Sequence, residues 1–207
     1  MFFVLLWSKL TKQNTIMMET YSAKPQLDLV EAAKLAVGRI MDFKGRSRRS
    51  EFWWWIVLVL LVNIGSSYLI GNNIYLSTVA SIVIMFFGLS VTVRRLHDMG
   101  QSGIWVYLSY AMGIATHAFV VFSDYGELMS ELAAMGISIK PQDLEYLMED
   151  YSGTIYTYLG LWFVWSVLSV VVVVMCFFDS KKQPNKYGES PKYYKPLEAE
   201  HNWITTP

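Results

Sequence analysis

The residues best suited to chemistry lie in one short segment, Arg94-Arg95-Leu96-His97-Asp98. A histidine next to an aspartate can act as an acid–base pair or supply half of a metal site. With Glu51 as a further carboxylate, this pair supports the hypothesis of an enzyme that works at a membrane interface. A second histidine and another carboxylate do not follow within reach in the sequence, so we predict no metal and no cofactor.

Other features of the chain argue against catalysis. The sequence has no nucleophile elbow and no phosphate-binding glycine loop. Its single cysteine, Cys176, can form neither an intrachain disulfide nor a cysteine-based zinc site. The formal net charge is zero, so no overall field attracts nucleic acid. We therefore expect a non-enzymatic protein without a nucleic-acid partner.

Three polar clusters, residues 45–55, 94–105 and 179–193, contain the candidate site residues. The first joins three arginines to the triple tryptophan Trp53–Trp55, a pattern typical of anchoring at a membrane interface. Desolvated charges near a membrane need partners, which favours a salt-bridge network among the clusters. The same arginines suit phosphate, so recognition of an anionic lipid headgroup stays open. The candidate patch consists of Arg46, Arg49, Glu51, Arg94, Arg95, His97, Asp98, Asp179 and Asn185.

The elements that must position these clusters are four apolar stretches. A helix needs roughly 20 residues to cross a bilayer, and each stretch is close to that length or longer. None of them contains Asp, Glu, Lys or Arg. We predict an all-α fold, an integral membrane four-helix bundle over residues 45–194. The four expected spans are residues 52–70, 74–93, 104–122 and 155–178.

The basic residues are concentrated on one side of the predicted spans. Sixteen of the 17 Lys and Arg residues lie before the first span, between the second and third, or after the fourth. The segment 123–153 has instead one lysine and seven acidic residues. Cytoplasmic loops of membrane proteins are enriched in Lys and Arg. We therefore expect both termini in the cytoplasm and segment 123–153 on the outer side.

Shorter elements are predicted around the spans. Residues 26–44 have the pattern of an amphipathic helix. This helix either lies along the cytoplasmic membrane surface or packs on the ends of the spans. The extracytoplasmic insertion 123–153 is expected to form two short helices, of which the second ends near Tyr151.

The two ends of the chain are predicted to lack regular structure. The first apolar run is too short for a secretory signal, and it precedes the basic residues instead of following them. We expect segment 1–25 to be disordered, and we raise the hypothesis that translation starts at Met17 or Met18. Residues 195–207 are expected to form a flexible tail.

Polar residues also occur inside the spans. Ser109, Gly113 and His117 recur every four residues and therefore share one helix face. Small residues on such a face allow close helix packing, and His117 could hydrogen-bond to Asn63 of the first span. An intramembrane histidine also suits a transport path. The absence of an accompanying charge in the spans favours packing.

The three clusters together resemble a known family. Its pattern has GR-x-x-R-x-E-[FY]-W before the first span, RRLHD-x-G-x-SGWW between the second and third, and D…N-x-[YF]-G-x-[SP]-P after the last. Residues 39–194 match this pattern, and the chain is similar to domain-of-unknown-function family 805, small bacterial inner-membrane proteins. Two departures are Ile104, where many members have tryptophan, and the long segment 123–153. The resemblance implies a multi-span protein of the bacterial inner membrane and implies no activity.

The leading functional hypothesis is a non-enzymatic scaffold or envelope-associated module. Its cytoplasmic patch would contact membrane lipids with anionic headgroups or a protein partner, and the protein could form a homo-oligomer. One alternative is a small transporter or oligomeric channel with a polar path near Asn63 and His117. The other is an interfacial enzyme that uses His97 and Asp98.

Overall fold

The computed structural model describes residues 21–71, 73–136 and 140–195. Helices make up nearly all of its regular structure, which confirms the all-α prediction. The helices of the described residues are α2 (Leu29–Gly38), α3 (Arg49–Ile70), α4 (Ile74–Asp98), α5 (Ile104–Phe122), α6 (Tyr125–Met135) and α7 (Pro141–Phe177). Two short strands, β1 (Ser22–Ala23) and β2 (Tyr193–Tyr194), pair antiparallel.

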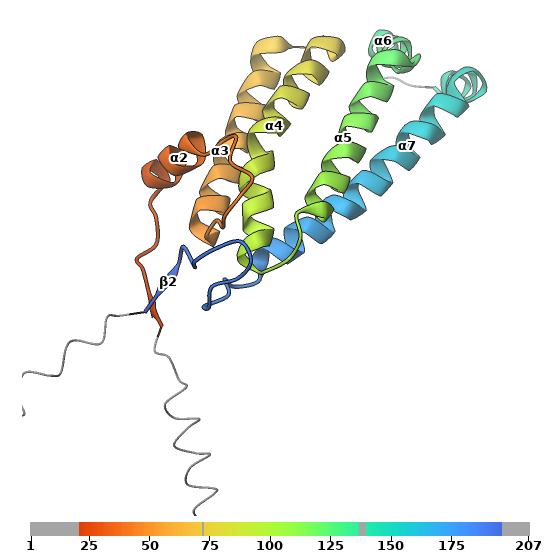
Figure 1. Ribbon diagram of the computed structural model, residues 1–207. Coiled ribbons are helices and arrows are strands. Elements are labelled where there is room, and N and C mark those ends of the chain that lie inside the picture. The colour runs from red at the N-terminus through yellow and green to blue at the C-terminus, as the bar shows by residue number, and fades with distance from the viewer. Residues whose placement is uncertain (1–20, 72, 137–139, 196–207) are drawn as a thin grey trace, which may run out of the picture.

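The four long helices form two pairs. α3 packs against α4 and α5 packs against α7, while α4 also contacts α5 and α7. Figure 1 shows the two pairs close together where α4 and α7 end and farther apart toward α6. The main apolar core includes Phe52, Trp55, Val93, Leu96 and Cys176, which lie in the parts of α3, α4 and α7 near this closed end.

The outer surface of these helices is apolar. α3, α4, α5 and α7 are each long and apolar enough to cross a membrane. Large apolar side chains point outward, for example Leu60, which is 57% exposed, and Phe163, which is 64% exposed. Such surface is unfavourable in water, whereas lipid tails are as apolar as these side chains. The four helices therefore indicate a multi-span membrane protein.

The structure corrects the end of the second span. The prediction ended this span at Val93 and placed Arg94–Asp98 in a loop, but α4 continues through Asp98. The extra turn is stabilised because Arg95 and Asp98 face each other one turn apart, with a distance of 2.6 Å between Nη1 and Oδ2. The connection to α5 is a short turn in which Gly100 adopts a φ of 77°, a conformation that favours glycine.

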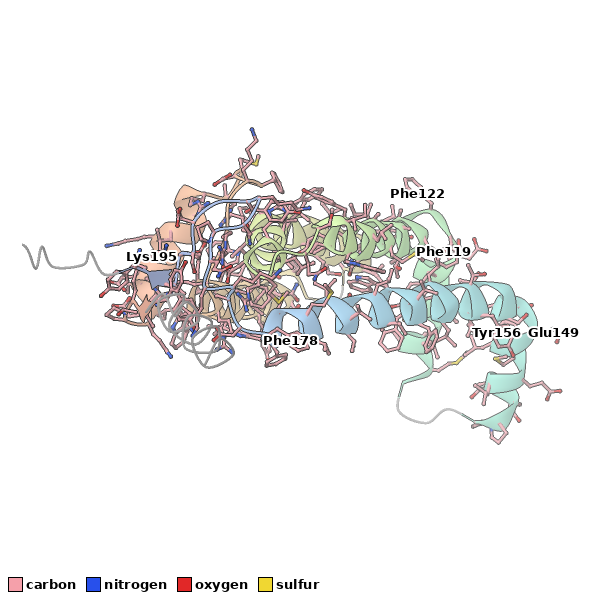
Figure 2. The ribbon with its side chains drawn as sticks, turned by 60° about the horizontal axis from the view of Figure 1, so that its bottom comes forward. Phe119, Phe122, Glu149, Tyr156, Phe178 and Lys195 are labelled. Atoms are coloured by element: carbon pink, nitrogen blue, oxygen red, sulfur yellow. The ribbon has the colours of Figure 1, made fainter. Side chains whose placement is uncertain are left out.

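The structure also differs from the predicted outer insertion. The expected short helix ending near Tyr151 is not separate, because α7 runs without interruption through this position into the fourth span. Figure 2 shows the axis of α7 turning near the labelled Glu149 and Tyr156. Ser152-Gly153 lies between these residues, and Gly and Ser pairs are a common cause of helix kinks. The helix is thus bent where a break was expected.

The N-terminal helix is shorter than the predicted segment 26–44. Asp28 and Glu31 form a capping box that begins α2. Ala32 and Ala36 are buried, and α2 packs against α3. Several larger apolar side chains of α2 stay exposed, so contact with a membrane surface stays a prediction.

The two ends of the described chain meet. Ser22 pairs with Tyr194 and Ala23 with Tyr193, so the end of segment 1–25 is regular where disorder was expected. The backbone amide of Lys24 continues this contact by donating to the Lys192 carbonyl at 2.8 Å. The hypothesis of a start at Met17 or Met18, and the tail beyond residue 195, lie outside the described residues.

Candidate functional site

Asp98 is the centre of a buried group of charged side chains. Its carboxylate accepts hydrogen bonds from Arg46 Nε at 2.8 Å and from Arg95 Nη1 at 2.6 Å. The Ser180 hydroxyl also donates to this carboxylate. The side chains of Arg95 and Asp98 are 0% exposed, and that of Arg46 is 1% exposed. Charges at this depth have lost their water, so they require partners of opposite charge.

A second ion pair lies on the same turn of α4. Arg94 Nη2 donates to Glu51 Oε1 at 3.0 Å, and both side chains are buried. Arg94 Nη1 donates to the carbonyl oxygens of Arg39, at 2.7 Å, and Asp42, at 2.5 Å. One guanidinium group therefore ties α4 both to the first turn of α3 and to the chain that follows α2. We refer to Arg46, Glu51, Arg94, Arg95 and Asp98 together as the buried cluster.

The buried cluster contains more arginines than carboxylates, and backbone carbonyls accept from most of the remaining donors; the buried Arg94 Nε has no hydrogen-bond partner. Arg95 donates to the carbonyls of Cys176 and Phe178, where α7 ends. Carbonyls at a helix C-terminus lack helical partners and carry partial negative charge, so they suit a cation. Arg46 donates in the same way to carbonyls of the segment after α7, those of Lys181, Gln183 and Gly188.

His97 and Asp98 do not form the acid–base pair considered from the sequence. His97 Nδ1 donates to the Gly45 carbonyl at 3.2 Å, while the Asp98 carboxylate is occupied by arginines. The His97 ring stacks on Tyr187, with 3.7 Å between ring centroids and an interplanar angle of 5°. Asn185 Nδ2 donates to the His97 carbonyl at 2.9 Å. His97 and Asn185 thus hold the C-terminal segment against the end of α4.

Asp179 lies apart from the buried cluster, in an exposed group. Its carboxylate is 3.2 Å from Arg49 Nη2 and 2.7 Å from Lys192 Nζ, and its side chain is 45% exposed. Partial burial favours a higher pKa for Asp179. Hydrogen bonds from Lys192, the Ser180 amide and Tyr193, with the charge of Arg49, outweigh that effect and lower the pKa to about 2.

The predicted patch therefore separates into two parts with different chemistry. The buried cluster is closed, with His97 and Asn185 beside it, and its charges are engaged with one another and with carbonyls. Arg49 and Asp179 remain partly exposed at the surface. Only this second part is open to a ligand.

A pocket with basic and aromatic walls opens beside Arg49. It has a volume of about 370 Å³ and lies between the end of β1, the first turn of α3 and the residue before β2. We call it the rim pocket. It is lined by Lys24, Gln26, Arg48, Arg49, Ser50, Trp53, Trp54 and Lys192.

Hydrogen bonds fix the walls of the rim pocket. Arg48 donates to the carbonyl of Pro25, and Trp54 Nε1 donates to the carbonyl of Leu27 at 3.2 Å. The Leu27 amide in turn donates to the Ser50 hydroxyl at 3.3 Å. The segment between β1 and α2 is therefore held against the start of α3, and this arrangement places Lys24 near Arg48.

Most of the rim pocket was missed by sequence reasoning. The arginines and tryptophans of the first cluster indicated a membrane interface, and Arg49 was in the candidate patch. Lys24 and Lys192 had no comparable signal, because they come from opposite ends of the chain and meet only through the β1–β2 pairing.

The intramembrane residues Asn63 and His117 bond within their own helices. His117 Nδ1 donates to the Gly113 carbonyl at 2.7 Å, and the His117 ring meets Trp165 edge-on at 5.4 Å between centroids. The backbone carbonyl of Asn63 accepts from the Ser66 and Ser67 hydroxyls. Among the described residues, no hydrogen bond joins His117 to Asn63. The His117 ring instead contacts Trp165 of α7. Within residues 21–71, 73–136 and 140–195, no three His, Cys, Asp or Glu side chains gather in a way that could hold a metal ion.

Four membrane-length helices, closed at one end by the buried cluster, define a multi-span helical membrane protein. A family model described as "Protein of unknown function (DUF805)" matches residues 40–189. The chain belongs to this family, which confirms the resemblance found in its three polar clusters.

Two curated relatives are similar to part of the chain. The uncharacterized protein YiiR of Escherichia coli strain K12 is 36% identical over 75 residues, which cover 33% of this chain and 49% of that protein. The YiiR protein of Escherichia coli O157:H7 matches with the same identity and the same coverage. The chain thus spans about half the length of the curated relatives it matches. No solved structure matches the chain.

Proposed function

We propose that the protein is a non-enzymatic membrane module that binds anionic phospholipid headgroups in the rim pocket. The observation that carries this proposal is the combination of four cationic side chains and two tryptophans around one cavity at the end of a membrane span. Arginine and lysine donate to phosphate oxygens, and tryptophan favours the level of the headgroups.

The charge balance of the rim pocket suits an anion. Asp179 neutralises part of the charge of Arg49 and Lys192, to which it is paired. Lys24 has no ion-pair partner in the part of the chain that the structure describes, and Arg48 is held by backbone carbonyls. The rim pocket therefore has a net positive charge. We expect it to bind an anionic headgroup more tightly than a zwitterionic one.

The buried cluster serves as the support of this pocket. It fixes the first turn of α3, the end of α4 and the end of α7 relative to one another. Arg94 and Arg95 are fully buried and do not line the rim pocket, so their role is to position the elements that do. The enzyme hypothesis receives less support because His97 and Asp98 have separate partners.

The membrane and its orientation are part of the proposal. The one-sided distribution of Lys and Arg supports an inner-membrane protein of a bacterium with both termini in the cytoplasm. The rim pocket then faces the cytoplasmic leaflet. Exposed apolar side chains of α2, such as Val30 and Val37, support contact of this helix with the same leaflet.

Lipid preference tests the proposal. We compare binding of phosphatidylglycerol and phosphatidylcholine by native mass spectrometry of the full chain, for the wild type and for a Lys24→Gln/Lys192→Gln variant. Because each basic residue near an anionic surface contributes about 1 kcal/mol, the variant should lose roughly tenfold or more of its phosphatidylglycerol preference.

The matched control removes the same charge elsewhere on the same side of the protein. Lys34→Gln/Lys44→Gln changes two exposed lysines outside the rim pocket and should keep the preference of the wild type. Equal loss in both double variants would show general electrostatic attraction instead of a pocket. A wild type that does not prefer phosphatidylglycerol would contradict the proposal altogether.

A further inference from the structure

A second cavity lies near the opposite end of the bundle. It has a volume of about 240 Å³ and is lined by residues of α4, α5, α7 and the first residue of α6. Ser77 and Thr78 of α4 and Thr116 and His117 of α5 are among them. An ionisable residue within a membrane span, here His117, is by default a candidate for a functional site, and Ser and Thr hydroxyls from two helices line the same cavity.

Four polar side chains of α4 and α5 in this cavity, Ser77, Thr78, Thr116 and His117, have acceptor atoms available. The hydroxyls of Ser77 and Thr78 donate to the Ile74 carbonyl, at 3.0 and 2.7 Å, and Thr116 donates to the Met112 carbonyl at 2.9 Å. These bonds use the hydroxyl protons and leave the oxygen lone pairs. His117 Nδ1 donates to Gly113, so the Nε2 atom of the neutral ring is also an acceptor.

The remaining walls of the cavity are aromatic. Trp162 and Trp165 come from α7, one turn apart, and Tyr158 lies one turn before them. Tyr125 packs on Tyr158 with 4.5 Å between ring centroids. The faces of such rings attract cations, and tryptophan does so most strongly.

We infer that this cavity binds the primary ammonium group of a small amine. An ammonium group has three N–H donors for the acceptor oxygens and a positive charge for the aromatic rings. No Asp, Glu, Lys or Arg lines the cavity, so the ligand need not displace an ion pair. The adjoining segment 123–153, with seven acidic residues and one lysine, attracts cations toward this end.

The size of the cavity limits the ligand. Sites for drug-sized molecules have volumes of roughly 300–1,000 Å³, and this cavity is smaller. A free amine such as ethanolamine fits this limit, and so does the ethanolamine headgroup of a phospholipid. Both sources present the same ammonium chemistry.

The experiment measures thermal unfolding of the full chain in phosphatidylcholine nanodiscs. Ethanolamine hydrochloride should raise the unfolding midpoint in a saturable way, because a ligand that binds the folded state stabilises it. Sodium chloride at equal ionic strength should leave the midpoint unchanged. Tetramethylammonium, which lacks N–H donors, should bind at least threefold more weakly than ethanolamine.

Variants then locate the site. Thr78→Val/Thr116→Val removes two acceptors and preserves side-chain shape, and it should weaken ethanolamine binding at least tenfold. Ser66→Ala/Ser67→Ala is the matched control, because these hydroxyls also donate to a carbonyl of their own helix but lie outside the cavity. If the threonine variant does not fold, His117→Phe is tested in its place, and ethanolamine binding should weaken by the same factor.

The source of the ligand is decided by the lipid. When phosphatidylethanolamine replaces phosphatidylcholine, a headgroup ligand should raise the midpoint by itself and abolish the response to free ethanolamine. A free-amine site should respond equally in both lipids. The inference is overturned if ethanolamine and sodium chloride act alike on the wild type, or if the cavity variants bind as well as the wild type. The lipids used here are zwitterionic, so failure of the rim pocket proposal would not affect the result.

Discussion

At the scale of single residues, Asp98 joins the N-terminal polar cluster to the middle one and to the segment after α7. Arg46 and Arg95 both depend on its carboxylate, and all three side chains are buried. A buried ion pair adds little net stability relative to an apolar replacement of the whole pair. Removal of one partner has a much larger effect, because the remaining charges stay buried without compensation.

We expect Asp98→Asn to lower the free energy of unfolding by about 3–5 kcal/mol. The reason is that the buried Arg46 and Arg95 would no longer have a negative charge beside them. The measurement is unfolding of the purified chain in mixed detergent micelles. Asp179→Asn is the control, since its ion pairs are exposed and should contribute about 0.2–1 kcal/mol. Similar losses in the two variants would contradict the different roles assigned to these aspartates.

Asp179 also has a defined pH dependence. Its folded pKa of about 2 lies below the ordinary value of 3.8, so its ionised form stabilises the folded state. This contribution is complete above the ordinary pKa and disappears as the pH falls through about 2. Because the side chain is 45% exposed, we expect a difference of only about 0.2–1 kcal/mol between wild type and Asp179→Asn at pH 6. The difference should be much smaller at pH 2, where the carboxylate is half protonated in the folded state, and one that grows toward low pH would have the wrong sign.

At the scale of elements, the packing of α5 depends on a small residue. A Cβ atom added to Gly113 would lie 2.9 Å from Trp165 Nε1 and 3.2 Å from Met85 Sδ. Gly113 therefore allows α5 to approach both α7 and α4 closely. The Ser109 hydroxyl lies on the same helix face and forms a 3.0 Å hydrogen bond with Ser169 of α7. The face predicted from Ser109, Gly113 and His117 is thus a packing face, and its outer end also lines the second cavity.

Substitution of glycine should have opposite effects at two positions in the spans. Gly113→Ala is expected to destabilise the protein by about 1–3 kcal/mol, because the new methyl group overpacks the contact with Trp165. Gly160→Ala in α7 meets nothing within 4 Å and should stabilise by up to about 1 kcal/mol, since alanine favours helix more than glycine. Thermal unfolding of both variants in the same detergent provides the comparison, and a neutral Gly113→Ala would show that the Trp165 and Met85 side chains can move aside without cost.

At the scale of the whole molecule, the two ends of the bundle have different characters. The closed end contains the buried cluster and the rim pocket, and Figure 2 shows Phe178 and Lys195 on this side. Figure 2 labels Phe119, Phe122 and Glu149 at the opposite end, which contains the acidic segment and the second cavity. A transport path would have to pass the closed end, where Arg94, Arg95 and Asp98 are fully buried between the helices.

The orientation of the molecule can be tested with its own cysteine left in place. Cys176 is 0% exposed and should not react with a membrane-impermeant maleimide. In intact cells, the reagent should label Glu145→Cys on the acidic side, whereas Lys34→Cys should react only after lysis. Both positions are exposed in the structure. Labelling of Lys34→Cys in intact cells would reverse the proposed topology.

Several features of this protein follow from the sequence by itself. The number and approximate position of the spans depend on the length and polarity of continuous segments, which need no tertiary information. The one-sidedness of Lys and Arg is likewise a property of the chain. Helix ends were less well predicted, because α4 continues past its apolar residues through the contact between Arg95 and Asp98.

Only the tertiary structure decided which charges are structural and which can meet a ligand. Arg46 is 52 residues from Asp98 and 137 residues from the Gln183 carbonyl to which it donates, so no local pattern indicates these partners. Carbonyl acceptors are invisible to reasoning from residue types, since every residue has one. The burial of the side chains distinguishes the buried cluster from Arg49, which is partly exposed. The β1–β2 pairing brings Lys24 and Lys192 together at the rim pocket.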